Sequence, residues 1–124
     1  MRQFRHTVWL GLPALVLTLG ACASVSAVPV PATVDLGDAR SRSAVETALA
    51  AAMKTAHVEL GPVASDQTPV VTVLPRRPGP MEGNSTAMPV AFDIIIDHGK
   101  CYARRRDTQA VYELRGAICA PQDH

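Results

Sequence analysis

The sequence predicts an α+β fold, in which one helix packs on a small antiparallel sheet of three to four strands held by one disulfide. An alanine-rich run over 44–56 has apolar residues at helical spacing. The segment 90–114 holds three short strand-like runs separated by two turns. Two cysteines, Cys101 and Cys119, lie within and just after that segment. The predicted limits of this single domain are 41–124, with an extended tether in front of it.

The first residues have the layout of a cleavable export signal. Arg2 and Arg5 supply positive charge, and an apolar run from Thr7 to Leu19 follows with no acidic residue. The run is shorter than the roughly 20 apolar residues that a helix needs to cross a bilayer. We therefore expect this segment to be a cleavable export signal and not a membrane span.

The end of this run reads Leu19-Gly20-Ala21-Cys22, which resembles the lipobox of bacterial lipoproteins. The resemblance implies that the Cys22 thiol receives a diacylglyceryl group, and that cleavage before Cys22 is followed by acylation, for example with palmitate. Ala23 stands where an inner-membrane retention signal has aspartate, which implies the periplasmic face of the outer membrane. The anchor would then be stable, because it has two or more acyl chains. The alternative is ordinary secretion with cleavage after Ala27, at a small-x-small site.

Residues 22–40 are expected to form the lipid-anchored tether. Val28-Pro29-Val30-Pro31 favours extended polyproline-like backbone, and the small residues around it give no helical face.

A helix is predicted from Ser43 onward. Ser43 and Glu46 have the spacing of a capping box. Apolar residues then recur every fourth position, with alanines beside them: Val45, Leu49, Met53, Ala52 and Ala56. We expect this stripe to pack against the sheet.

A β-branched run between two prolines, Val70–Leu74, predicts a short strand at an edge of the sheet. The segment 75–89 then contains four prolines and two glycines. Loops of about 15 residues in a compact domain are often functional or mobile. Arg76 and Arg77 at its start are either a contact for an acidic partner or a solvated pair.

Three strands are expected in the C-terminal third, over Val90–Ile96, Cys101–Arg106 and Ala110–Leu114. Alternation places Phe92 and its apolar neighbours on one face and Asp93 on the other. Turns at 97–100 and 107–109 join the strands into a meander.

The cysteine count predicts one disulfide. With Cys22 lipidated, Cys101 and Cys119 are the remaining thiols of an exported chain, so they are expected to pair and to tie the tail to the second strand. A reactive or metal-binding Cys101 is the alternative.

The charge and the motifs exclude several function classes. A formal net charge of +1 falls to −1 once Arg2 and Arg5 leave with the signal, so nucleic-acid binding is not expected. No nucleophile elbow, phosphate-binding glycine loop or paired metal-ligand motif is present. We expect no enzyme activity, no catalytic residues, no resident metal and no cofactor.

Two groups of residues remain as candidate sites. Asp93, Asp97 and His98 are either a weak metal or proton-transfer site or ordinary turn residues. The second group is a basic strand face made of Lys100, Tyr102, Arg104 and Arg106. Tyr112, on the next strand, is expected across from Tyr102. This face either binds an anionic partner, such as an envelope protein or cell-wall polymer, or is an edge protected from aggregation by charge.

The sequence thus predicts a small, non-enzymatic envelope lipoprotein that serves as an accessory or interaction module. The alternative is a periplasmic inhibitor of a hydrolase, such as a lysozyme or a protease, with the loop 75–89 as the inserting segment.

Overall fold

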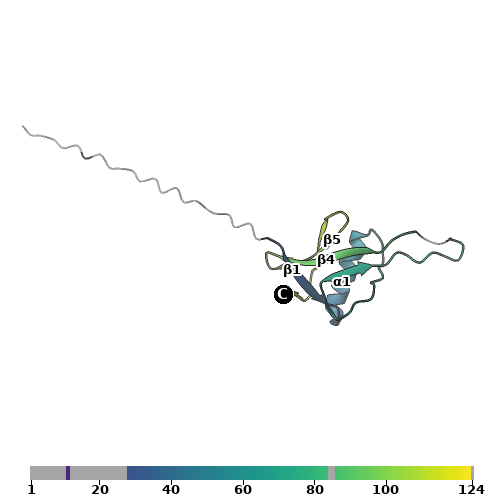
Figure 1. Cartoon of the computed structure of the whole chain (residues 1–124), viewed down its shortest axis with the longest axis horizontal. Helices are drawn as coiled ribbons and strands as arrows, with labels where there is room; N and C mark the ends of the chain where they lie inside the picture. The colour runs from purple at the N-terminus through teal and green to yellow at the C-terminus, as the bar shows by residue number, and fades with distance from the viewer. Residues whose placement is uncertain (1–10, 12–27, 84–85, 124) are drawn as a thin grey trace, which may run out of the picture.

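One helix and an antiparallel sheet of seven strands make up the fold (Figure 1). The computed structural model describes residues 11, 28–83 and 86–123. The elements in chain order are β1 (Val30–Asp35), α1 (Ala39–Ala52), β2 (Gln67–Thr68), β3 (Val70–Val73), β4 (Val90–Asp97), β5 (Lys100–Arg105), β6 (Val111–Glu113) and β7 (Cys119–Pro121). The α+β class is confirmed, and the sheet is larger than the predicted three to four strands because β1, β2 and β7 join it.

Strand β4 is the centre of the sheet. β5 pairs with it from Phe92 to Asp97, and β6 adds to the far side of β5. The other edge of β4 is shared by two strands, β3 over its first half and β1 near its end. β3 pairs with no other named strand, and segment 59–61 closes its outer side through hydrogen bonds from Gly61 N to Thr72 O (2.7 Å) and Leu74 N to Glu59 O (2.8 Å).

The predicted tether is wrong from Val30 onward, because β1 belongs to the sheet. Ala32 and Val34 are fully buried, and β1 pairs with β2, β4 and β7. The prolines fit because Pro31 lies near the start of the strand, where its carbonyl accepts a hydrogen bond from Gln122 N (2.9 Å). The predicted domain limit at residue 41 is therefore too late.

The helix begins earlier than the predicted start at Ser43. Asp38 is the N-cap, and its carboxylate accepts a hydrogen bond from Ser41 N at 2.7 Å. Ser43 is an exposed residue within the helix, so the predicted capping box does not form. The helix ends at Ala52, short of the predicted Ala56, and Lys54 after it has a positive φ of 53°.

The apolar stripe of the helix is confirmed from Val45 to Met53, whereas Ala56 lies beyond the helix and is exposed. Val45 and Leu49 are fully buried in the core. One turn before Val45 on the same face is Ser41, also fully buried, whose Oγ accepts a hydrogen bond from Ile118 N at 2.7 Å. The helix is thereby joined to the chain that leads into β7.

The meander of β4, β5 and β6 is confirmed. His98 and Gly99 form the two-residue turn between β4 and β5 with φ values of 49° and 75°. Positive φ at both central residues is the requirement of a type I′ hairpin turn, whose twist matches that of the paired strands.

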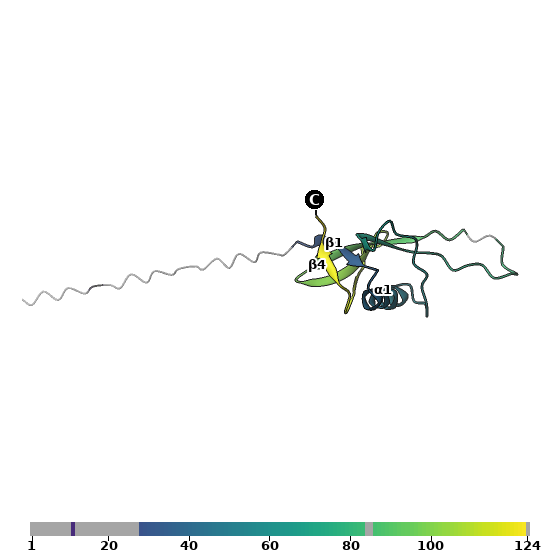
Figure 2. The same cartoon turned by 90° about the horizontal axis from the view of Figure 1, so that it is seen from below.

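The core lies between α1 and one side of the sheet, as Figure 2 shows. The buried residues of this cluster are Ala32, Val34, Leu36, Val45, Leu49, Ala52, Val71, Val73, Phe92, Ile94, Ala103 and Leu114. The predicted disulfide is confirmed: Cys101 on β5 is bonded to Cys119 on β7, with Cα atoms 6.2 Å apart. It ties the last strand of the chain to the meander.

The predicted signal and Cys22 lie outside the described residues, apart from Gly11. In the part of the chain that is described, no helix is long and apolar enough to cross a membrane.

Candidate interaction surface

The meander has one covered and one uncovered side. α1 lies on the side of Phe92 and Ile94 (Figure 2). Strand alternation places the neighbouring residues on the other side, which we call the open face and define by Asp93, Ile95, Tyr102, Arg104 and Arg106.

Strand pairing brings the predicted basic residues onto this open face. Tyr102 lies between Ile95 on β4 and Glu113 on β6, and it is half-buried. Arg104 is directly opposite Asp93. Lys100 is exposed at the end of the face, beside the hairpin turn. The prediction that Tyr112 lies across from Tyr102 is wrong.

Tyr112 belongs to the core side. It pairs with Ala103, and its ring meets that of Phe92 edge-on, with centroids 6.2 Å apart. The register explains this, because Glu113 is the residue opposite Tyr102.

Arg106 is already engaged within the chain. Its Nε and Nη2 donate to Oδ1 of Asp93 at 3.0 and 2.8 Å. This hydrogen bond raises the pKa of Arg106 above its ordinary value. The carboxylate of Asp93 therefore neutralises Arg106. Two more carboxylates lie on this face, since Asp97 is opposite Lys100 and Glu113 is opposite Tyr102.

Arg104 is a cation with no partner in the described part of the chain. It makes no ion pair or hydrogen bond there, and its Nε is enclosed by neighbouring atoms. The residue as a whole is half-buried. An enclosed N–H without an acceptor costs free energy, and the part of the Arg104 guanidinium that a ligand can reach is the part that lines the neighbouring hollow.

A shallow hollow of about 340 Å³ opens beside Arg104. Apolar residues from β1, the β2–β3 junction, β3 and β4 form part of its lining: Pro31, Pro69, Val70, Ile94 and Ile95. Arg106 with its partner Asp93, and Gln122 from the tail, complete the rim. The arrangement can accept one anionic group attached to a small apolar body.

Arg105 points to the covered side and does not contribute to the open face. Its Nε and Nη2 donate to the two carboxylate oxygens of Asp107 at 2.6 and 3.0 Å. This hydrogen bonding lowers the pKa of Asp107 and raises that of Arg105. The pair closes the turn after β5, a structural role.

The acidic group around the hairpin turn is not brought together. Asp93 is bound to Arg106, while Oδ1 of Asp97 lies 2.6 Å from Nδ1 of His98. Among the described residues, no three His, Cys, Asp or Glu side chains form a group that could hold a metal ion. Asp97 and His98 therefore form a local turn contact.

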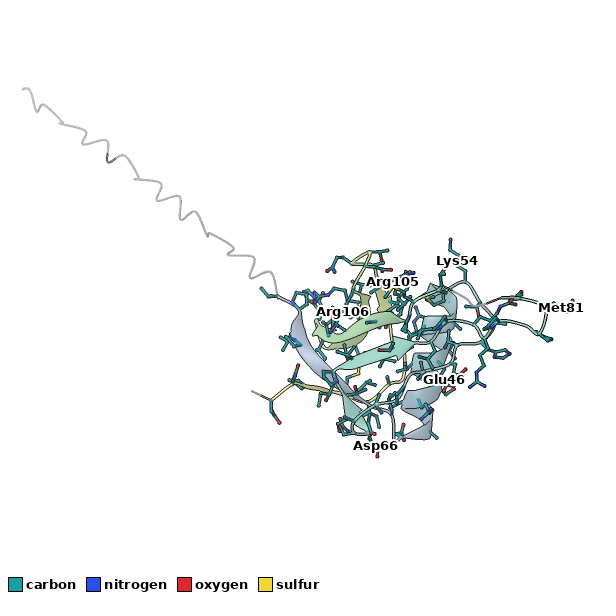
Figure 3. The ribbon with its side chains drawn as sticks, turned by 45° about the vertical axis from the view of Figure 1, so that its right-hand side comes forward. Glu46, Lys54, Asp66, Met81, Arg105 and Arg106 are labelled. Atoms are coloured by element: carbon teal, nitrogen blue, oxygen red, sulfur yellow. A yellow bond between two sulfur atoms is a disulfide. The ribbon has the colours of Figure 1, made fainter. Side chains whose placement is uncertain are left out.

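The described parts of the loop, residues 75–83 and 86–89, extend away from the sheet (Figures 1 and 3). Glu82 organises a tight turn, because its carboxylate accepts hydrogen bonds from Arg76 (2.9 Å) and Gly79 N (3.1 Å). Glu82 N also donates to Gly79 O at 3.0 Å. This turn presents Met81, whose surface is 97% exposed.

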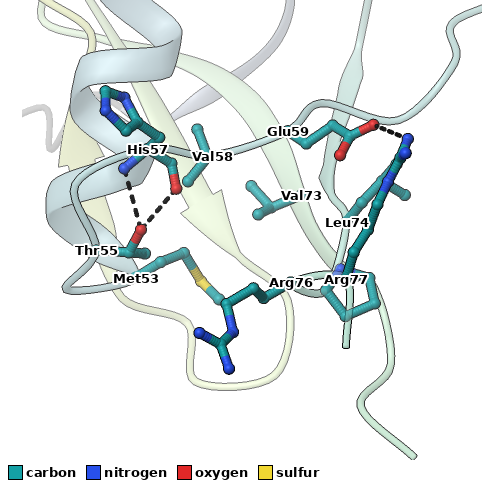
Figure 4. Close-up of a pocket in the computed structure, with 10 residues that line it drawn as sticks. Met53, Thr55, His57, Val58, Glu59, Val73, Leu74, Arg76 and Arg77 are labelled. Carbon is teal, nitrogen blue, oxygen red and sulfur yellow. Dashed lines mark hydrogen bonds and ion pairs between the residues drawn. The ribbon is translucent and has the colours of Figure 1, made fainter. Parts of the chain in front are cut away.

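A second hollow, of about 520 Å³, lies at the base of this loop (Figure 4). Met53, Val58 and Val73 give it apolar walls, and the ion pair between Arg77 and Glu59 (3.1 Å) borders it. Arg77, predicted either to contact an acidic partner or to be solvated, is largely exposed and forms a surface ion pair with Glu59.

Two features of the open face could not be predicted from the sequence. Asp93 was placed opposite the apolar face, but its pairing with Arg106 depends on the strand register. Pro31 and Val70 reach the hollow from strands that only the fold brings to β4.

Comparison with protein families, curated proteins and solved structures finds no match for this chain.

Proposed function

We propose that this chain is an exported bacterial lipoprotein, anchored through Cys22 at the periplasmic face of the outer membrane, which acts as a non-enzymatic interaction module. The lipobox-like sequence Leu19-Gly20-Ala21-Cys22 supports the anchor. A disulfide between Cys101 and Cys119 is in keeping with an oxidising compartment.

The open face is the proposed binding surface. The observation that carries this proposal is the half-buried Arg104, which has no ion-pair partner among the described residues and lies on a sheet face that α1 does not cover. Tyr102 beside it and Lys100 at its end add an amphipathic ring and a second cation. Tyrosine and arginine are enriched in the energetic centres of protein interfaces.

Intact mass of the protein purified from its own membranes tests the anchor. We expect a chain that begins at Cys22 and carries acyl groups, and we expect Cys22→Ser to move the protein into the soluble fraction. Ser24→Ala is the matched control and should stay with the membrane. An unmodified chain that begins at Val28 would contradict the anchor and indicate simple secretion.

The extended loop favours a second candidate, a periplasmic hydrolase inhibitor. Its specific support is Met81, which is 97% exposed on a turn where the Glu82 carboxylate accepts hydrogen bonds from Arg76 and from Gly79 N. A preformed apolar tip that projects from the body suits insertion into an enzyme cleft, because little conformational freedom is lost on binding.

Crosslinking in native membranes, followed by identification of the captured protein, separates the two candidates. We expect the double variant Arg104→Ala/Arg106→Ala to lose the partner. Arg40→Ala/Arg42→Ala is the matched control on α1, since Arg40 has no partner among the described residues and Arg42 pairs with Glu46 (3.2 Å). The inhibitor would be favoured if the variant Arg104→Ala/Arg106→Ala still captured the partner, and if replacement of residues 76–88 by a short turn abolished the capture.

A further inference from the structure

The hollow on the open face has the properties of a site for one carboxylate on a small apolar group. Arg104 lines it and forms no ion pair among the described residues, because Asp93, the carboxylate opposite it, is bound to the neighbouring Arg106. The guanidinium is a planar fork of donors that matches the two oxygens of a carboxylate.

The walls decide which class of anion fits. Pro31, Pro69 and Val70 supply the accessible apolar part of the lining, since Ile95 is only 4% exposed. The polar part consists of Asp93, Arg104, Arg106 and Gln122. A doubly charged phosphate in such a place would need more donors than one arginine and the amide of Gln122 supply. A long anionic polymer would need several free cations in a row, whereas this face has Arg104 and the more distant Lys100. A carboxylate next to an apolar side chain satisfies both the charge and the walls.

The volume limits the size of the ligand. At about 340 Å³ the hollow is at the small end of the range for ligand pockets, roughly 300 to 1,000 Å³. It therefore suits the last one or two residues of a peptide. The proline side chains of β1 and of the β2–β3 junction are rigid, so they offer a preformed surface to a methyl or similar group.

We propose that this hollow binds the C-terminal carboxylate of a peptide that ends in a small apolar residue, with Arg104 as the residue that binds the carboxylate. The proposal rests on the proposed function, because it names the chemistry that the open face recognises.

NMR titration of the mature chain, residues 22–124 with Cys22→Ser to keep it in solution, tests the site. The probe is N-acetyl-alanyl-alanine, with its C-terminal amide and inorganic phosphate as comparisons. We expect saturable shifts at the Arg104 Nε–H signal and at the amides of Val70, Ile95 and Tyr102. The amide form should bind at least about tenfold more weakly, because it lacks the charge that the guanidinium recognises.

Variants assign the effect to Arg104. Arg104→Gln should weaken binding at least about tenfold, and Arg104→Lys should also weaken it, since lysine keeps the charge and loses the fork. Lys54→Gln removes another cation without a partner among the described residues and should leave the affinity unchanged. Unchanged spectra away from the open face show that each variant is folded.

Three results would overturn the proposal: no saturable shift with the peptide, equal binding of acid and amide, or tighter binding of phosphate. These results leave the proposed function standing if the open-face variant still loses a captured protein in native membranes. If the peptide binds but no partner depends on the open face, the interaction module fails while the carboxylate site remains.

Discussion

Phe92→Ala is expected to lower the free energy of unfolding by about 4 kcal/mol, the largest effect of any single change considered for this fold. Phe92 is fully buried at the centre of β4, and it pairs with Val71 on β3 and Arg105 on β5. Its ring also meets Tyr112 edge-on. Removal of the ring leaves a cavity under α1 and loses the aromatic contact, and both effects add to the lost burial.

Urea unfolding followed by circular dichroism measures this loss. Phe92→Leu should cost clearly less, because leucine fills most of the same volume. Val111→Ala is the matched control on β6, where the side chain is 49% exposed, and it should change stability by less than about 0.5 kcal/mol. A loss below about 2 kcal/mol for Phe92→Ala would mean that the core between α1 and the sheet is looser than the structure shows.

The parts of the fold that the sequence predicted are those whose signals are local. The hairpin between β4 and β5 is defined by alternation on both sides of a turn that contains Gly99. The disulfide is predicted by the count of cysteines in a chain that is expected to be exported. In both cases the residues that decide the structure are close together or few in number, so no knowledge of distant pairing was needed.

The strands that the sequence missed are held by distant partners. Pro29 just before β1 and Pro31 within it favour polyproline-like backbone. Ala32 and Val34 are nevertheless buried in a strand, because β2 from the middle of the chain and β7 from its far end pair with β1. β7 contains only three residues and has no pattern of its own. Such strands form because the rest of the fold supplies a partner, which local propensity does not encode.

The helix start shows how two capping signals compete. Ser43 and Glu46 have the right spacing, but a start at Ser43 would leave Ser41 outside the helix. With Asp38 as the cap, Ser41 lies on the buried side and binds Ile118 N. The start at Asp38 could not be predicted from apolar periodicity, because the buried residue of the first turn, Ser41, is polar.

The candidate surface was predicted in its residues and not in its electrostatics. Alternation along one strand correctly placed Arg104 and Arg106 together. Their roles differ because Asp93, on the neighbouring strand, binds Arg106 and leaves Arg104 without a partner in the described residues. The distinction requires the position of a carboxylate on another strand, and one strand's sequence does not contain it.

Loss of the disulfide is expected to lower the free energy of unfolding by about 3 kcal/mol, by the chain-entropy estimate for a loop of this length. Cys101 and Cys119 are separated by 18 positions, and the bond links β5 to the tail that pairs with β1. A domain of this size has a total stability of roughly 5 to 15 kcal/mol, so the bond accounts for a large share.

Single and double variants distinguish the stability contributed by the disulfide bond from that contributed by the packing of each cysteine side chain. In a chain with Cys22→Ser, the variants Cys101→Ser, Cys119→Ser and the double variant should all lose about the same amount in urea unfolding, because each removes one and the same bond. Hydrogen exchange should also accelerate most in β7 and in the part of β1 that faces it. If the double variant instead lost the sum of the two single losses, each cysteine would stabilise the fold through its own contacts. A loss below about 1 kcal/mol would show that strand pairing and the Ser41–Ile118 hydrogen bond suffice to hold the tail in place.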